Sequence, residues 1–195
     1  MYDNSLGMCG KMGKVIALYQ LYDRTEEEEW KEQADAILDS LVSASIYPFP
    51  FDYSFGLIGM GVGFEWLIRK GFIDACPDLL LKEIDEVLIR IIVFRPQIPT
   101  NIKNGLLGIG YYLYTRLVYR KNENTPKVLT LKENVLYYID WLGETLQNAS
   151  IDKNYYEYYF ILVLLHQLNI YNAKIINLLA FCEKCITENN YKRHG

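Results

Sequence analysis

The sequence lacks any hydrophobic run long enough to cross a membrane as a helix. Its longest apolar stretch, residues 158–165, is far shorter than the roughly 20 residues that a bilayer requires. Asp3, Lys11 and Lys14 interrupt the first 18 residues, which therefore do not have the apolar core of a secretory signal peptide. We expect a cytoplasmic protein without membrane contact.

Basic residues are not in excess either. The chain has 20 Lys and Arg residues against 24 Asp and Glu residues, which gives a net charge of −4, and its isoelectric point is near 5.3. A protein that binds DNA or RNA usually presents a basic face to the phosphates. We therefore expect no nucleic acid among its partners.

Cysteine and histidine are scarce, at four and two residues in 195. So few cysteines in a cytoplasmic chain favour reduced thiols over a disulfide framework. Cys182 and Cys185 share one face of a predicted helix, but a second pair is missing from the sequence. His166, Cys9 or Cys76 could complete a zinc site only if the chain closed on itself. We expect no cofactor, with zinc at Cys182 and Cys185 as a weaker alternative to simple packing of the thiols.

Glycine, in contrast, occurs in a repeated pattern. Gly7, Gly56 and Gly105 are each 49 residues apart, and every one opens a Gly-x-x-Gly motif that an apolar, helix-like run follows. Self-similarity at a period of 20 to 50 residues is typical of stacked supersecondary units, none of which buries its apolar face without a neighbour.

The second half of each repeat carries apolar residues at positions i, i+3, i+4 and i+7, which form one stripe of an α-helix. The three stripes are Ala34, Ile37, Leu38, Leu41; Ile84, Val87, Leu88, Ile91; and Val135, Tyr138, Ile139, Leu142. Each repeat is therefore predicted to be a helical hairpin, and the protein to be all-α.

The expected first helices occupy residues 11–22, 59–70 and 106–118. The returning helices begin near Thr25, cover residues 79–94, and begin near Thr130. Thr25 with Glu28, and Thr130 with Glu133, have the spacing of a capping box, and Pro77 suits a helix entry. A fourth repeat without the glycines contributes helices over residues 154–168 and 173–189, which makes eight in all.

Two explanations account for glycine at three helix starts, where it lowers helix propensity by roughly 1 kcal/mol. Glycine permits close approach of backbones, or the unpaired N–H groups of the helix N-termini converge on a pocket for an anion or a peptide. Tyrosine, with 17 residues, could pack in the core or line such a pocket. The candidate peptide-binding residues are Gly7, Gly10, Gly56, Gly59, Gly105, Gly108, Tyr111 and Tyr112.

Asp3, Asp52 and Asn101 share the 49-residue spacing, each four residues before its glycine. We expect a turn or helix cap, because Asp and Asn side chains bond nearby backbone N–H groups. The alternative is a pair of carboxylates for glycoside hydrolysis, with Glu65 and Glu157 as further candidates.

At these glycine motifs the sequence resembles the LanC-like (lanthionine synthetase C-like) family. The resemblance covers about residues 1–120 and is carried by Ser5-Leu6-Gly7-Met8-Cys9-Gly10-Lys11-Met12-Gly13, Gly56-Leu57-Ile58-Gly59-Met60-Gly61-Val62-Gly63-Phe64-Glu65-Trp66-Leu67-Ile68 and Asn104-Gly105-Leu106-Leu107-Gly108-Ile109-Gly110. It implies an α/α toroid of inner and outer helices. About four hairpins would form half of such a ring, as one repeat domain over residues 1–195 with repeats near 3–50, 52–100, 101–150 and 151–190.

The resemblance also implies a cyclase that joins cysteine thiols to dehydrated serine or threonine in a precursor peptide, with zinc held by two cysteines and a histidine. In this sequence the matching positions are Ser5, Ser54 and Lys103, so none of the ligands is present. We therefore expect a non-catalytic accessory or peptide-binding member in lanthipeptide or related ribosomal peptide modification. Two alternatives stay open: a helical repeat interaction scaffold unrelated to lanthipeptides, and a zinc-dependent cyclase fragment that needs a partner. The expected partner is a peptide or protein, with a homodimer through the open array ends as a further possibility.

Overall fold

The computed structural model describes residues 5–45, 49–148 and 154–194, with side chains up to residue 189. Within those ranges the protein is all-α, as predicted: the described residues form nine helices and no strand. No helix among them is long and apolar enough to cross a membrane. The chain divides into two compact units, Met1–Leu88 and Ile89–Gly195. The predicted single domain and incomplete ring concern how these units join, and both stay predictions.

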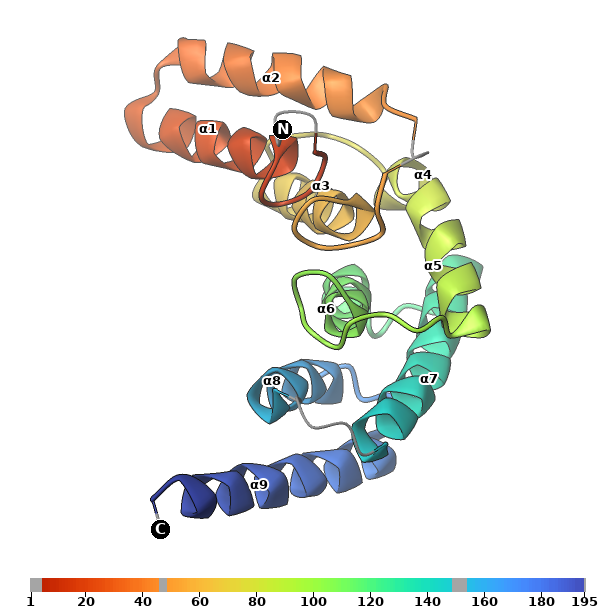
Figure 1. Cartoon of the computed structure of the whole chain (residues 1–195). Coiled ribbons are helices and arrows are strands. Elements are labelled where there is room, and N and C mark those ends of the chain that lie inside the picture. The colour runs from red at the N-terminus through yellow and green to blue at the C-terminus, as the bar shows by residue number, and fades with distance from the viewer. Residues whose placement is uncertain (1–4, 46–48, 149–153, 195) are drawn as a thin grey trace. The chain divides into compact units, whose positions relative to one another are not determined.

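Unit 1 contains the first hairpin and most of the second. Its helices are α1 (Lys11–Thr25), α2 (Glu28–Val42), α3 (Leu57–Lys70), α4 (Pro77–Leu80) and the beginning of α5 (Lys82–Phe94). Helix α1 packs along α2 and also against α3, and α3 contacts α4 (Figure 1).

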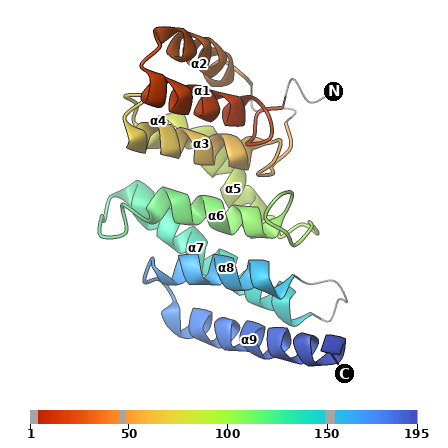
Figure 2. The ribbon, with the colours of Figure 1, turned by 90° about the vertical axis from the view of Figure 1, so that its left-hand side faces the viewer.

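Unit 2 contains the end of α5 and the last two hairpins, α6 (Leu106–Leu117) with α7 (Pro126–Gln147) and α8 (Tyr155–His166) with α9 (Asn172–His194). Helix α6 contacts both α7 and α8, and α9 contacts both α8 and α7. Figure 2 shows α6, α8 and α9 side by side.

The predicted apolar stripes supply much of the core. Ala34, Leu38 and Leu41 are buried in unit 1, and all four residues of the third stripe are buried in unit 2. The first helices of the second and third repeats, α3 and α6, are buried almost all round. This agrees with the apolar, helix-like runs that follow the glycine motifs in the sequence, because a helix that is apolar all round is typically buried.

The predicted capping box at Thr25 is wrong. Thr25 is the last residue of α1, and its hydroxyl donates to the Leu21 carbonyl at 3.0 Å. Glu26 then takes a left-handed conformation (φ 58°) and its N–H bonds the Tyr22 carbonyl. Helix α2 begins at Glu28 with no side-chain cap. Thr25 is therefore used to end one helix rather than to begin the next.

The predicted capping box at Thr130 is also wrong, and for a related reason. Helix α7 begins earlier, at Pro126, with Thr125 as the N-cap whose hydroxyl accepts from the Val128 N–H at 3.4 Å. Thr130 lies one turn inside the helix, where its hydroxyl donates to the Pro126 carbonyl. A proline at the first helical position fixes the start, because its missing N–H is not needed there.

The returning helix of the second repeat is broken in two. Pro77 begins α4 as predicted, but Leu81 departs from helical backbone angles (φ −100°, ψ 10°) before α5 begins at Lys82. The Leu81 N–H still bonds the Pro77 carbonyl at 3.0 Å. The break is thus a local distortion, and it makes nine described helices out of the expected eight.

Candidate functional site

The second and third glycine motifs close two loops with the same backbone scheme. The Leu57 N–H donates to the Pro50 carbonyl at 3.0 Å, and the Leu106 N–H donates to the Pro99 carbonyl at 2.8 Å. A Cβ atom on Gly56 or Gly105 would overlap the same carbonyl oxygens. Glycine is therefore required at both positions by close backbone approach.

Asp52 and Asn101 form the predicted turns inside these loops. The Asp52 carboxylate accepts from the Phe55 N–H at 2.6 Å, and the Asn101 side-chain oxygen accepts from the Asn104 N–H at 2.8 Å. Asp3 lies outside the described residues. The turn interpretation is confirmed for the other two repeats.

Three of the six glycine N–H groups of the candidate site are engaged within the chain. Gly10 N bonds the Gly7 carbonyl, Gly59 N bonds the Asp52 carbonyl and Gly108 N bonds the Gly105 carbonyl, at 2.9, 3.2 and 3.0 Å. Five of the six glycines, all except Gly10, are buried. Close packing of the backbone therefore explains why glycine occupies these positions.

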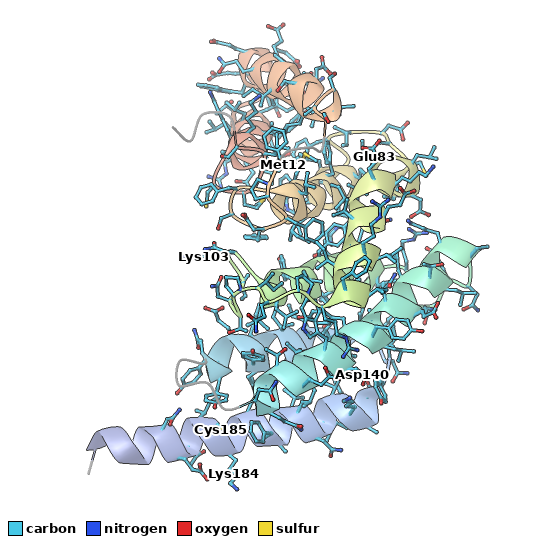
Figure 3. The ribbon with its side chains drawn as sticks, turned by 45° about the vertical axis from the view of Figure 1, so that its right-hand side comes forward. Met12, Glu83, Lys103, Asp140, Lys184 and Cys185 are labelled. Atoms are coloured by element: carbon cyan, nitrogen blue, oxygen red, sulfur yellow. The ribbon has the colours of Figure 1, made fainter. Side chains whose placement is uncertain are left out.

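In unit 1 the first glycine motif packs on the loop of the second. Backbone N–H groups of Leu6, Met8 and Cys9 donate to the carbonyls of Phe55, Tyr53 and Ser54 respectively. Met12 of α1 lies over α3 (Figure 3), where a Cβ on Gly63 would overlap its side chain.

In unit 2 the fourth repeat replaces the missing glycines with Glu157. One carboxylate oxygen accepts from the Ile102 N–H at 2.9 Å, and the other accepts from the Asn154 side-chain amide at 3.0 Å. Glu157, like Asp52, therefore has a structural function.

A groove of about 560 Å³ lies beside the third glycine motif, wholly within unit 2. One wall is the extended segment after α5, the floor includes Leu106, and the other wall is the end of α7. Its apolar lining comes from Pro96, Ile98, Pro99, Leu106 and Trp141, and its polar lining includes Arg95, Gln97, Glu144 and Thr145. The lining thus mixes apolar and polar residues, and more of its exposed surface is polar than apolar.

Arg95 links the two walls and has an unfavourable backbone conformation. Its φ is +46°, and its N–H bonds the Ile91 carbonyl at 2.9 Å in the position where helices usually end in glycine. A residue with a Cβ costs about 1–2 kcal/mol there. Arg95 Nη1 bonds Glu144 Oε2 at 2.6 Å across the groove.

The ion pair does not by itself explain the strained arginine. The Arg95 and Glu144 side chains are 32% and 59% exposed, and a solvent-exposed pair contributes only about 0–1 kcal/mol. Strain of this kind concentrates at functional positions, but Glu26, Asn169 and Tyr171 have the same left-handed conformation, so the backbone angle alone does not single out Arg95. Val93 and Phe94, just before Arg95, are 64% and 79% exposed, which also favours contact with a partner at this end of α5.

Of the two candidate tyrosines, Tyr112 is fully buried and belongs to the core, whereas Tyr111 is half-buried. Exposed aromatic residues lie on several elements, and two of them, Tyr156 and Phe160, share α8 with the buried Tyr158 and Ile161.

Three residues of this chain stand at the positions that match the zinc ligands of the LanC-like family, and their side chains do not fit a zinc centre. Ser5 and Ser54 offer hydroxyls and Lys103, on the exposed loop before α6 (Figure 3), offers an ammonium group; structural and catalytic zinc takes thiolate, imidazole or carboxylate ligands. No three His, Cys, Asp or Glu side chains gather as possible metal ligands in the described part of the chain.

The weaker alternative, Cys182 and Cys185 on α9, offers two thiols. Cys182 is buried, and its pKa is raised to about 12, first by burial and then by the nearby Cys185 and Glu183. Structural zinc takes four ligands, and no group of three or more His, Cys, Asp or Glu side chains that could hold a metal forms around this pair in the described residues.

Comparisons of the chain with protein-family models, curated proteins and solved structures give no match.

The residues that line the groove were not predicted from the sequence. Pro50 and Pro99 share the 49-residue spacing, so the loops could have been found by extending the repeat upstream. Arg95, Trp141 and Glu144 carry no comparable signal, because only the return of α7 brings them to the loop.

Proposed function

We propose that this chain is a cytoplasmic, non-catalytic peptide-binding protein that acts in lanthipeptide or related ribosomal peptide modification. The observation that carries the proposal is the amphipathic groove beside Gly105 and Leu106, in the third copy of the LanC-like motif. Apolar walls would hold side chains of an extended peptide, while Arg95, Gln97 and Glu144 would bond its polar groups.

The residues at the resemblance's zinc positions support binding rather than catalysis. Cyclisation in the LanC-like manner requires a substrate thiol as thiolate, which zinc supplies. Ser5, Ser54 and Lys103 do not supply ligands for that ion. The proposed action is therefore to hold a leader or modified peptide for another enzyme.

A groove-filling substitution tests the proposal. The probe is a fluorescein-labelled linear peptide of about 15 residues, rich in Ser, Thr and Cys, kept reduced and followed by fluorescence anisotropy. Thr145→Phe would fill the groove and is expected to weaken binding more than tenfold. Thr130→Phe is a matched control, because both threonines lie on α7 and donate to a carbonyl four residues earlier, yet Thr130 is exposed and outside the groove.

Equal loss of affinity in both variants, or no binding by the wild-type chain, would refute the proposal. Elemental analysis for zinc, on protein purified without chelator or metal resin, tests the non-catalytic part. About one zinc per chain, lost in Cys182→Ser, would favour the cyclase-fragment alternative instead.

The α8 surface favours a second candidate, an interaction scaffold unrelated to lanthipeptides that pairs with a second copy of the chain. Tyr156, Phe160 and Val163 are exposed at spacings of four and three residues, which is the seam of a two-helix contact. The same seam on two copies can form a symmetric interface. Light scattering during size exclusion would then give a dimer that Phe160→Glu dissociates; a monomer at high micromolar concentration would exclude this candidate.

A further inference from the structure

The groove contains hydrogen-bond donors that the protein does not use. A guanidinium group has five N–H donors, and only Nη1 of Arg95 has a partner, Glu144, among the described residues. The edge formed by Nε and Nη2 remains for a ligand. That edge matches the two oxygens of a carboxylate, which can accept two parallel bonds from it.

Trp141 supplies a second unused donor. Its side chain lines the groove and is only 6% exposed, and its indole N–H has no hydrogen-bond partner among the described residues. An indole nitrogen can only donate, and this N–H is not among the buried polar atoms without a partner in the described residues, so it stays accessible from the groove. A ligand with acceptor oxygens would complete this bond.

The remaining lining limits the rest of the ligand. Pro96, Ile98 and Pro99 form an apolar part of the lining, beside the polar Gln97, Thr145 and Asn148. An apolar side chain next to the carboxylate would contact that apolar part. Glu144 already pairs with this arginine, so a ligand carboxylate would share the guanidinium group with it, and each further negative charge on the ligand adds repulsion. The groove thus suits one carboxylate on an apolar body.

We propose that the groove captures the free C-terminal carboxylate of a peptide whose last residues are apolar, with Arg95 and Trp141 as the donors. This inference rests on the proposed peptide-binding function and adds which end of the peptide is recognised. The C-terminus of such a peptide combines a carboxylate with an adjacent apolar side chain, and the rest of its backbone can continue away from the groove.

Two versions of one fluorescein-labelled peptide test the inference with the full chain. Both end in Leu-Phe after the same Ser-, Thr- and Cys-rich sequence, but one has a free carboxylate and the other a C-terminal amide. We expect the acid to bind at least tenfold more tightly. In Arg95→Gly, which removes the donors and the Cβ strain together, the two peptides should bind equally weakly, and the thermal midpoint should not fall.

Arg95→Lys keeps the charge without the two-donor edge and should retain only part of the preference for the acid. Trp141→Phe keeps a ring but loses the N–H, and should weaken binding of the acid severalfold. Lys184→Gln removes a positive charge from the exposed face of α9 (Figure 3), where Lys184 pairs loosely with Glu188. This control should leave both affinities unchanged.

Equal binding of acid and amide to the wild-type chain would overturn the inference and leave the proposed function standing. The inference would also be overturned if an amide peptide with a glutamate near its end bound as tightly as the acid, because the recognised group would then be a side chain. Failure of both peptides to bind would overturn the proposed function and the inference together.

Discussion

The loops that end at Gly56 and Gly105 have one backbone design and different surroundings. Each is closed by an N–H bond to a proline carbonyl and contains an Asp or Asn turn. In unit 1 the N-terminal glycine motif covers the loop with three backbone hydrogen bonds. In unit 2 the loop borders a groove and is held by Glu157 instead.

The different surroundings of the two loops indicate where a binding site can form in a repeat protein. The conformation of each loop is set locally, by glycine, proline and a short polar side chain. What lies against the loop is set by the neighbouring repeat, and a binding surface arises where a neighbour leaves the loop open. Fold and repeat alone do not decide function.

The largest expected effect is on stability, from substitution of either loop glycine. Gly56→Ala and Gly105→Ala should each lower the free energy of unfolding by about 3 kcal/mol, because the new methyl group overlaps a buried carbonyl oxygen. Urea denaturation followed by circular dichroism measures the loss.

Gly143→Ala on α7 is the control for both. Its added Cβ would lie 3.4–3.6 Å from flexible side chains of Leu178 and Lys174, and alanine favours a helix over glycine by about 1 kcal/mol. It should leave stability unchanged or raise it. A loss in only one of the loop variants would show that the two loops are not equivalent.

The Asp52 and Asn101 turns should contribute less to stability than the loop glycines do, and the two turns should contribute similar amounts. Asp52→Ala and Asn101→Ala each remove one side-chain acceptor from a loop N–H, and each should cost about 1 kcal/mol in urea denaturation. Asp52→Asn keeps an acceptor oxygen and should recover most of the loss. If it recovered none, the charge rather than the hydrogen bond would hold the turn.

Alkaline pH should distinguish the two units. Burial raises the pKa of Tyr19 in unit 1 and of Tyr138, Tyr158 and Cys182 in unit 2, with Cys182 reaching about 12. These groups ionise more easily in the unfolded chain, so their contribution to stability is complete below the ordinary pKa. That contribution is lost as pH rises through about 9 to 12.

Unit 2 has more buried tyrosine and cysteine side chains with a raised pKa than unit 1. It should therefore lose structure at a lower alkaline pH. Trp30 and Trp66 report on unit 1 and Trp141 on unit 2, so fluorescence titrations of Trp141→Phe and of the Trp30→Phe, Trp66→Phe double variant separate them. Coincident transitions would contradict the expected order.

Thiol reactivity should differ between the units without any change in stability. Cys9 and Cys76 of unit 1 are exposed, Cys185 is half-buried and Cys182 is buried. A chromogenic disulfide reagent at pH 8 should modify the first two at once, Cys185 slowly, and Cys182 only after unfolding, because the reactive thiolate is both shielded and scarce. Rapid modification of Cys182 would contradict its burial.

Much of the local structure followed from sequence pattern. The 49-residue glycine spacing and the i, i+3, i+4, i+7 stripes predicted the hairpins, and α3 begins two residues before its predicted start. The errors occurred at helix ends such as Thr25 and Thr130, where a threonine can serve either the helix before it or the one after it. That choice depends on hydrogen bonds that spacing alone does not distinguish.

The sequence by itself determined an all-α chain of repeated hairpins with turns at Asp52 and Asn101, because helix periodicity and glycine's lack of a Cβ act within a few residues. Only the tertiary structure decided that Tyr112 belongs to the core and that Arg95 meets Glu144 beside Trp141. The Arg95–Glu144 pair joins residues 49 positions apart in the chain. It depends on how α7 packs against the rest of unit 2, which no local pattern encodes.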